Sequence, residues 1–151
     1  MANFLTVGEA ADALGVTPRQ LRYLGIGAIT SVDGSRLYDA DGLALVALYG
    51  RVAARFEAWG LPVWRARAAL LYLEADIRAA CLQRGAPVLV LDPWRGVVRV
   101  AASTSAPKTQ TIAIRPVLAE MRARVAHTRT ERPALWTGRA FTRAPELVAA
   151  V

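Results

Sequence analysis

The sequence predicts a mainly α-helical fold with small β elements, of the α+β class. Apolar residues make up 54% of the 151 residues, which is enough to form a packed core. Apolar side chains recur at helical spacing before residue 85, whereas shorter β-branched runs separated by turn residues follow it. We therefore expect a helical domain over residues 1–84, a small β-hairpin/α module over 85–127 and a basic tail over 128–151.

Two short helices are expected at the start of the chain, over Val7–Leu14 and Pro18–Leu24. Each is preceded by the spacing of a capping box, in which a hydroxyl and a side-chain carbonyl oxygen satisfy free backbone amides. The two pairs are Thr6 with Glu9 and Thr17 with Gln20. Gly15 suits the left-handed stop between the helices. Two short helices joined by a turn that contains glycine have the outline of a helix-turn-helix.

A β-hairpin and two longer helices are expected next. Ile29–Val32 and Ser35–Tyr38 flank Asp33-Gly34, which is a strong signal for a two-residue turn. Helices then follow over about Asp41–Trp59 and about Pro62–Arg84. The side chains expected to face the core are Leu45, Leu48, Val52, Phe56, Val63, Leu70, Leu73 and Ile77.

An ordered series of short motifs runs through this region. It consists of TVGEAA at 6–11, LGVT at 14–17, LRY at 21–23, GSRLY at 34–38 and WGLP at 59–62. In order and nearly in spacing, the series resembles the DNA-binding domain of the MerR family of transcriptional regulators. The resemblance covers about residues 4–75. It implies a winged helix-turn-helix that binds double-stranded DNA and a chain that acts as a prokaryotic transcriptional regulator.

The second helix carries the residues best suited to read a base sequence. An α-helix fits the major groove, where arginine can pair with guanine and glutamine with adenine. The resemblance implies that Tyr23 binds a backbone phosphate and that Arg36 and Tyr38 of the wing contact the backbone at the minor groove. The expected DNA-binding residues are Thr17, Pro18, Arg19, Gln20, Arg22, Tyr23, Arg36 and Tyr38.

The C-terminal module departs from the family, because Gly85 and Pro87 end the helix that would form the family's coiled-coil dimer. Its expected elements are strands over Ala86–Leu91, Val97–Ala101 and Thr111–Ile114 and a helix over Pro116–Ala126. Dimerisation, small-ligand sensing and recruitment of another protein all suit such a module. We favour a homodimer, because a helix-turn-helix on one half-site usually needs a symmetric partner.

Exposed aromatic and basic residues could also bind a protein partner through 85–151. Trp94 is expected at the exposed tip of the second hairpin, where it could anchor an interface. The tail has several arginines, which could grip phosphates or dock on a partner protein.

Charge and composition narrow the function classes. The net charge is +7, but residues 1–50 carry −2, from three arginines against five acidic residues. With Cys81 and His127 as the only residues of their types, neither a metal nor a cofactor is expected. No catalytic motif appears, so an enzyme is not expected. No apolar run is long enough to cross a bilayer, which favours a cytoplasmic protein without a membrane partner.

Two other functions fit the same residues. An excisionase-like or phage architectural factor, or an antitoxin that represses its own operon, would keep DNA binding but change its task. A protein–protein adaptor would keep the winged helix without binding DNA, and the acidic balance of residues 1–50 is the best argument for it.

Overall fold

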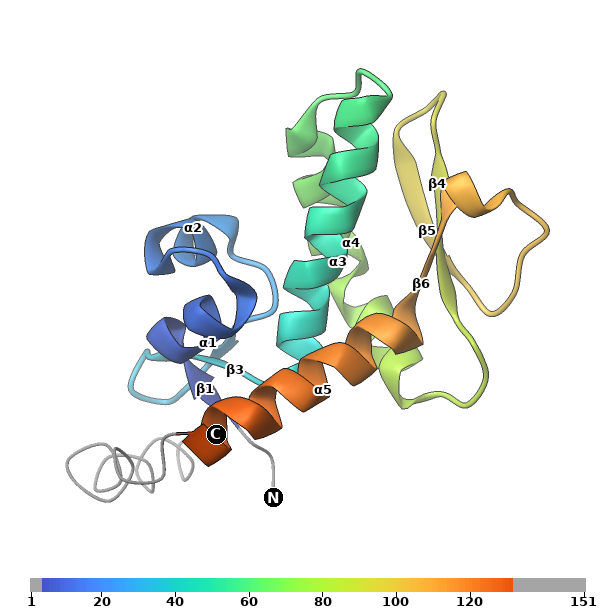
Figure 1. The fold of residues 1–151 in the computed structure, drawn as a ribbon. Helices are drawn as coiled ribbons and strands as arrows, with labels where there is room; N and C mark the ends of the chain where they lie inside the picture. The colour runs from blue at the N-terminus through green and yellow to red at the C-terminus, as the bar shows by residue number, and fades with distance from the viewer. Residues whose placement is uncertain (1–3, 132–151) are drawn as a thin grey trace. The chain divides into compact units, whose positions relative to one another are not determined.

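The computed structural model describes residues 4–131 and shows a mixed helix and sheet content, in agreement with the α+β expectation (Figure 1). The chain divides into two compact units. The first unit holds the residues up to Leu43 and the described residues from Glu120 onward, and the second holds Ala44–Ala119. This grouping differs from the expected division at residues 84 and 127. The observed boundaries lie inside helices, since one helix spans Ala40–Ala58 and another spans Ile114–Glu131.

The first unit begins with the two predicted helices, α1 (Val7–Leu14) and α2 (Pro18–Leu24), whose expected bounds are confirmed. Both capping boxes form, with the hydroxyls of Thr6 and Thr17 accepting hydrogen bonds from the backbone N–H groups three residues later. Gly15 ends α1 in the left-handed conformation, with a φ of 71°. Local sequence signals therefore fix where each helix begins and where α1 ends.

A three-stranded antiparallel sheet completes the N-terminal part of this unit. Its strands are β1 (Leu5–Thr6), β2 (Ile29–Thr30) and β3 (Arg36–Tyr38), in the order β1-β3-β2. The predicted two-residue turn is wrong. Residues 31–35 form a longer loop, closed by a 2.9 Å hydrogen bond from the Ser31 N–H to the Ser35 carbonyl. Strand β1 was not expected, and it makes β3 the central strand.

Two glycines meet where β3 leads into α3 (Ala40–Ala58). A Cβ atom added to either Gly27 or Gly42 would collide with the backbone carbonyl of the other. Asp39 accepts a 2.7 Å hydrogen bond from the Gly42 N–H and so satisfies an amide of the first turn of α3. The start of the helix is thereby held against the loop that follows α2.

The second unit is built on the later part of α3 and on α4 (Val63–Leu82). Seven of the eight expected inward-facing side chains are buried, but Val63 is 39% exposed, so its assignment to the core was wrong. Val63 is the first residue of α4, where the neighbouring turn does not yet cover the side chain. Gly60 lies in the connection between α3 and α4 and adopts the left-handed conformation, with a φ of 75°.

A second antiparallel sheet follows, in the order β5-β4-β6. Its strands are β4 (Val88–Asp92), β5 (Val97–Ala101) and β6 (Thr111–Ala113), close to their expected positions. A short 3-10 turn, η1 (Lys108–Gln110), precedes β6, and α5 (Ile114–Glu131) follows it. Helix α5 is therefore longer than the expected Pro116–Ala126.

Arg55 of α3 links the helices to this sheet. Its guanidinium donates hydrogen bonds to the backbone carbonyls of Lys108, Thr109 and Thr111, at 3.2, 2.9 and 2.6 Å. Cys81 is buried in α4, where its small side chain is part of the core. Of the helices between residues 4 and 131, none is long and apolar enough to cross a membrane. The expected basic tail lies almost wholly outside the described residues.

Candidate nucleic-acid interface

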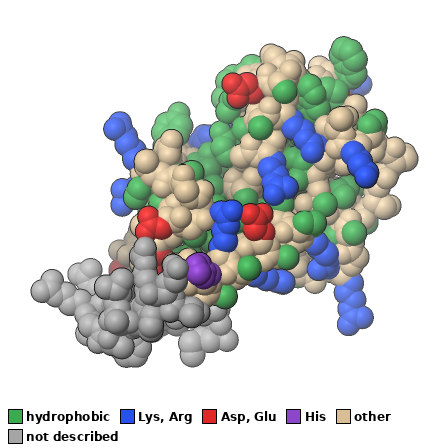
Figure 2. Space-filling model, in the orientation of Figure 1, with side chains coloured by type: hydrophobic (Ala, Val, Ile, Leu, Met, Phe, Trp, Pro, Cys, Tyr) green, Lys and Arg blue, Asp and Glu red, His purple; other side chains and the backbone are tan. Residues whose placement is uncertain are grey.

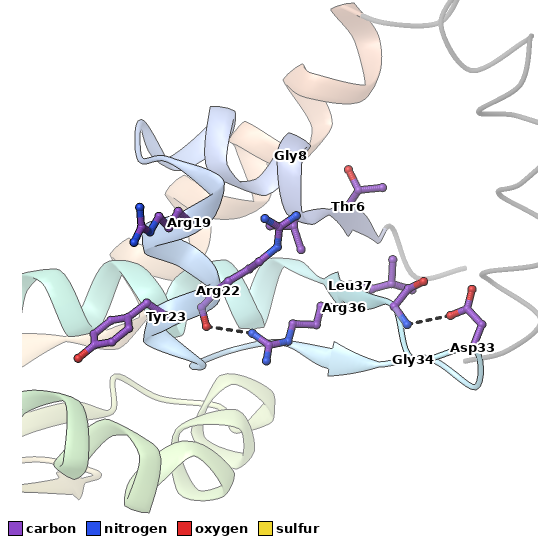
Figure 3. A pocket seen from close by; sticks show the side chains of 11 residues that line it. Thr6, Gly8, Arg19, Arg22, Tyr23, Asp33, Gly34, Arg36 and Leu37 are labelled. Atoms are coloured by element: carbon purple, nitrogen blue, oxygen red, sulfur yellow. Dashed lines mark hydrogen bonds between the residues drawn. The ribbon is translucent and has the colours of Figure 1, made fainter.

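An open hollow of about 1130 Å³ lies on the first unit, beside α2 (Figure 3). Three places in the chain line it: the start of α1, the outer side of α2, and the loop between β2 and β3 with the first residues of β3. Its charged lining residues are Arg19, Arg22, Arg36 and Asp33. Three positive charges therefore face one negative charge in a space open to solvent.

Helix α2 is divided into a buried face and an exposed face. Leu21 and Leu24 are buried in the core of the unit. Arg19, Arg22 and Tyr23 are exposed, and the Tyr23 side chain is 82% exposed. In Figure 3 the three side chains extend from α2 in different directions. The helix thus holds its polar residues on the surface through the packing of its two leucines.

The capping box at the start of α2 limits what Gln20 can do. The Thr17 Oγ1 accepts a 3.1 Å hydrogen bond from the Gln20 N–H, and the Thr17 N–H donates a 2.9 Å hydrogen bond to the Gln20 Oε1. The expected pairing of glutamine with adenine uses both the oxygen and the nitrogen of the side-chain amide. The cap uses one of the two lone pairs of the Gln20 Oε1, so a pair with adenine would have to share that oxygen with the cap.

Arg36 connects the sheet to the last turn of α2. Its Nη1 donates a 2.9 Å hydrogen bond to the backbone carbonyl of Arg22, as Figure 3 shows. A carbonyl in the last turn of a helix lacks a partner within the helix, so this bond satisfies it. Arginine has five N–H donors, and the remaining ones can bind another acceptor. The bond therefore holds a cation beside α2 without using up its donors.

Asp33, predicted from the sequence only as a turn residue, also lines this hollow. Its carboxylate accepts hydrogen bonds from the Ser31 hydroxyl and, at 2.9 Å, from the Ser35 N–H. These bonds lower the pKa of Asp33 from 3.8 to about 2. The carboxylate is therefore ionised at neutral pH, and it reduces the positive charge of the hollow from +3 to +2. Only the three-dimensional closure of the loop reveals this role.

Tyr38 does not belong to an exposed surface, so its expected contact with DNA is wrong. The residue is fully buried, because β1 pairs with β3 and sets Leu5 opposite Tyr38. Among the described residues, no group forms a hydrogen bond with its hydroxyl. Burial raises the pKa of this hydroxyl above 10.0. An unexpected two-residue strand thus converts a predicted contact residue into a core residue.

The hollow brings together half of the eight predicted residues: Arg19, Arg22, Tyr23 and Arg36. Thr17, Pro18 and Gln20 are exposed at the start of α2 but do not line it. Thr6, Val7 and Gly8 line the opposite side and were not predicted as site residues. A Cβ atom added at Gly8 would meet no neighbouring atom within 4 Å, so this side of the hollow is open space.

Comparisons with protein-family models, with curated proteins and with solved structures found no match to this chain.

Proposed function

We propose that the chain binds double-stranded DNA with α2 in the major groove and Arg36 on the sugar-phosphate backbone, and that it acts as a prokaryotic transcriptional regulator. One observation carries the proposal: α2 buries its leucines and leaves Arg19, Arg22 and Tyr23 exposed beside the cation of Arg36. A short helix with a polar outer face, beside a hairpin that carries an arginine, is an arrangement that winged helix-turn-helix proteins use on DNA.

The side chains of α2 suit two kinds of contact. Arg22 and Arg19 can each donate two hydrogen bonds to the O6 and N7 atoms of a guanine, which is the commonest specific contact in the major groove. The phenolic hydroxyl of Tyr23 can donate to a phosphate oxygen. In this assignment the arginines read the sequence, and Tyr23 sets the register of the helix on the duplex.

Arg36 suits a phosphate rather than a base. One of its donors is engaged by the carbonyl of Arg22, which holds the guanidinium in place before DNA binds. Its remaining donors can form a charge-assisted hydrogen bond with a phosphate oxygen. Such a contact adds affinity for any duplex and positions α2, but it does not select a sequence.

The local charge supports DNA binding although residues 4–43 carry a net charge of −2. Asp39 accepts a hydrogen bond at the start of α3, and Glu9 belongs to the capping box of α1. Asp33 is the acidic residue that lines the hollow. The lining itself therefore keeps a net charge of +2, and a short-range contact with phosphate is favourable there.

A seven-residue helix contacts only a few base pairs, so we further propose that two copies bind two half-sites as a homodimer. A two-fold symmetric dimer recognises an inverted repeat. If the chain instead bound tandem direct repeats, the proposed function would change from a transcriptional regulator to an architectural factor of the excisionase type.

The test is selection of bound duplexes from random sequence by the full chain, followed by titration of the best site. Arg22→Ala should weaken binding to that site by about 1–3 kcal/mol and relax the preference at one base position. Arg122→Ala is the matched control, because it removes an exposed arginine of α5 that does not line the hollow. Equal affinities of the wild type and Arg22→Ala would remove α2 from the interface.

A further inference from the structure

A second groove, of about 480 Å³, lies within the second unit between α4 and the hairpin formed by β4 and β5. We call it the α4–hairpin groove. Trp64, Arg65 and Tyr72 of α4 line one side, and Arg95 and Val97 of the hairpin line the other. Among the described residues, no Asp or Glu lines it. The groove is therefore mainly apolar with two positive charges, and the Arg95 Nε lies 4.0 Å from the Asp92 carboxylate.

Large aromatic side chains stand out from this region into solvent. Trp64 is 67% exposed, Tyr72 is 86% exposed, and Trp94 at the hairpin tip is 91% exposed. Trp64 and Tyr72 are eight residues apart, which places them on one face of α4 and about 12 Å apart along its axis. The small side chains of Ala68 and Ala69 line the groove between them. Exposed aromatic residues gathered in this way mark a binding surface.

The groove is held in shape by its own hydrogen bonds. The Arg65 Nη1 donates to the Arg95 carbonyl at 3.1 Å, and the Arg65 guanidinium lies 5.8 Å from the centre of the Trp64 ring. At the hairpin tip, the N–H groups of Trp94 and Arg95 donate to the Asp92 Oδ1 at 2.8 and 3.1 Å. The aromatic and cationic groups are thus positioned without a ligand.

The charge of the second unit indicates what the groove would attract. Residues 44–119 hold ten Lys and Arg against four Asp and Glu, a net charge of +6. Figure 2 shows Lys and Arg side chains scattered among hydrophobic ones on one face of the molecule. This unit, rather than residues 4–43, carries most of the positive charge of the chain. The favoured occupant is a polyanion with flat apolar faces.

We propose that the α4–hairpin groove binds single-stranded nucleic acid. Unpaired bases stack on Trp64 and Tyr72, and Arg65 and Arg95 contact the phosphates. Stacking on aromatic rings combined with a positive groove is how proteins hold single strands without sequence preference. A duplex does not fit this chemistry, because its base faces are already stacked. A second copy of the chain is also disfavoured, because it would bring a second unit of charge +6 to the same surface.

The experiment titrates the full chain with fluorescently labelled (dT)15, which cannot pair with itself and so does not test duplex binding. We expect the tryptophan fluorescence of the protein to be quenched as the anisotropy of the oligonucleotide rises. With two phosphate contacts, the logarithm of affinity should fall with the logarithm of salt with a slope of about −1.4, a loss of about sevenfold from 50 to 200 mM. No quenching and no change in anisotropy would overturn the proposal.

Exposed side chains give variants that leave the core intact. Trp64→Ala and Tyr72→Ala should each weaken (dT)15 binding at least about fivefold, because both side chains line the groove. Leu82→Ala is the control, because Leu82 is 81% exposed at the end of α4 and does not line the groove. Unchanged affinity in both aromatic variants, with circular dichroism spectra like that of the wild type, would overturn the proposal.

Two other occupants produce different results. Poly-L-glutamate that competes with (dT)15 on an equal charge basis, and loses affinity in the same variants, would assign the groove to an acidic protein instead. Self-association in sedimentation that Trp64→Ala abolishes, without any binding of (dT)15, would assign it to a second copy of the chain. Either result overturns single-strand binding.

Discussion

The Arg36 guanidinium donates a 2.9 Å hydrogen bond to the backbone carbonyl of Arg22, which joins the central strand of the first sheet to the last turn of α2. The two residues come from different elements, and the bond fixes the Arg36 guanidinium relative to the backbone of α2. One of the charges proposed to contact DNA is therefore positioned before any DNA arrives.

We expect Arg36→Ala to weaken binding to all duplexes by a similar factor. A phosphate contact is independent of sequence, so the variant should also reduce the salt-dependence slope by about one unit. The measurement is a series of duplex titrations at several salt concentrations, on the selected site and on an unrelated sequence. A loss confined to the selected site would show instead that Arg36 contacts a base.

Thr17→Ala should lower the free energy of unfolding by about 0.5–2 kcal/mol, because it leaves the Gln20 N–H without its capping acceptor. Thr17→Ser keeps the hydroxyl and is the matched control. Chemical denaturation monitored by circular dichroism gives both values. If the two variants unfold at the same denaturant concentration, the capping box contributes no net stability.

Asp33→Asn should raise the affinity for duplex DNA, because it removes the negative charge of the hollow and keeps an oxygen that can accept the loop hydrogen bonds. Asp76→Asn, an exposed carboxylate of α4, is the control for a general change in net charge. Equal gains in the two variants, measured by titration at low salt, would show that Asp33 has no local effect.

The same carboxylate makes the stability of the loop dependent on pH. Hydrogen bonds to the ionised form lower the pKa of Asp33, so their contribution is complete above about pH 3.8 and is lost as the pH falls toward 2. The difference in unfolding free energy between the wild type and Asp33→Asn should therefore shrink below pH 3.8. A difference that does not change with pH would contradict this assignment.

Tyr38→Phe should increase the free energy of unfolding by up to about 1–3 kcal/mol, because the wild type buries a hydroxyl without a hydrogen-bond partner among the described residues. DNA binding should not change. The raised pKa of Tyr38 also means that stability falls as the pH rises above 10, where the unfolded state can ionise and the folded state resists. That part of the alkaline loss should be absent in Tyr38→Phe.

Short-range signals explain what the sequence predicted well. The bounds of α1 and α2 follow from capping pairs three residues apart, and the buried positions of α4 follow from helical spacing. Strand β1 could not be predicted, because two residues carry no alternating pattern and their partner strand comes much later in the chain. The missed strand is also the reason why the burial of Tyr38 was missed.

The candidate site was predictable where local patterns determine exposure, but not where contacts depend on how the elements pack. The exposure of Arg19, Arg22 and Tyr23 follows from the burial of Leu21 and Leu24 on the other face of a short helix. The bond between Arg36 and the Arg22 carbonyl depends on how the sheet packs against α2, which no local pattern encodes. The engagement of the Gln20 side-chain oxygen by the helix cap also becomes visible only when the hydrogen bonds of its side chain are known.

The contact between Gly27 and Gly42 restricts how this chain can evolve. The backbone of each glycine occupies the space that a side chain of the other would need. Any other residue at either position would therefore collide with the backbone of the remaining glycine. Any homologue that keeps this junction between the loop after α2 and the start of α3 should carry glycine at both positions. Gly27 and Gly42 thus form a sequence signature: two glycines fifteen positions apart, the first after the pair of short capped helices and the second at the start of a long helix. Such a signature could identify distant homologues whose overall sequence identity is too low for detection by alignment.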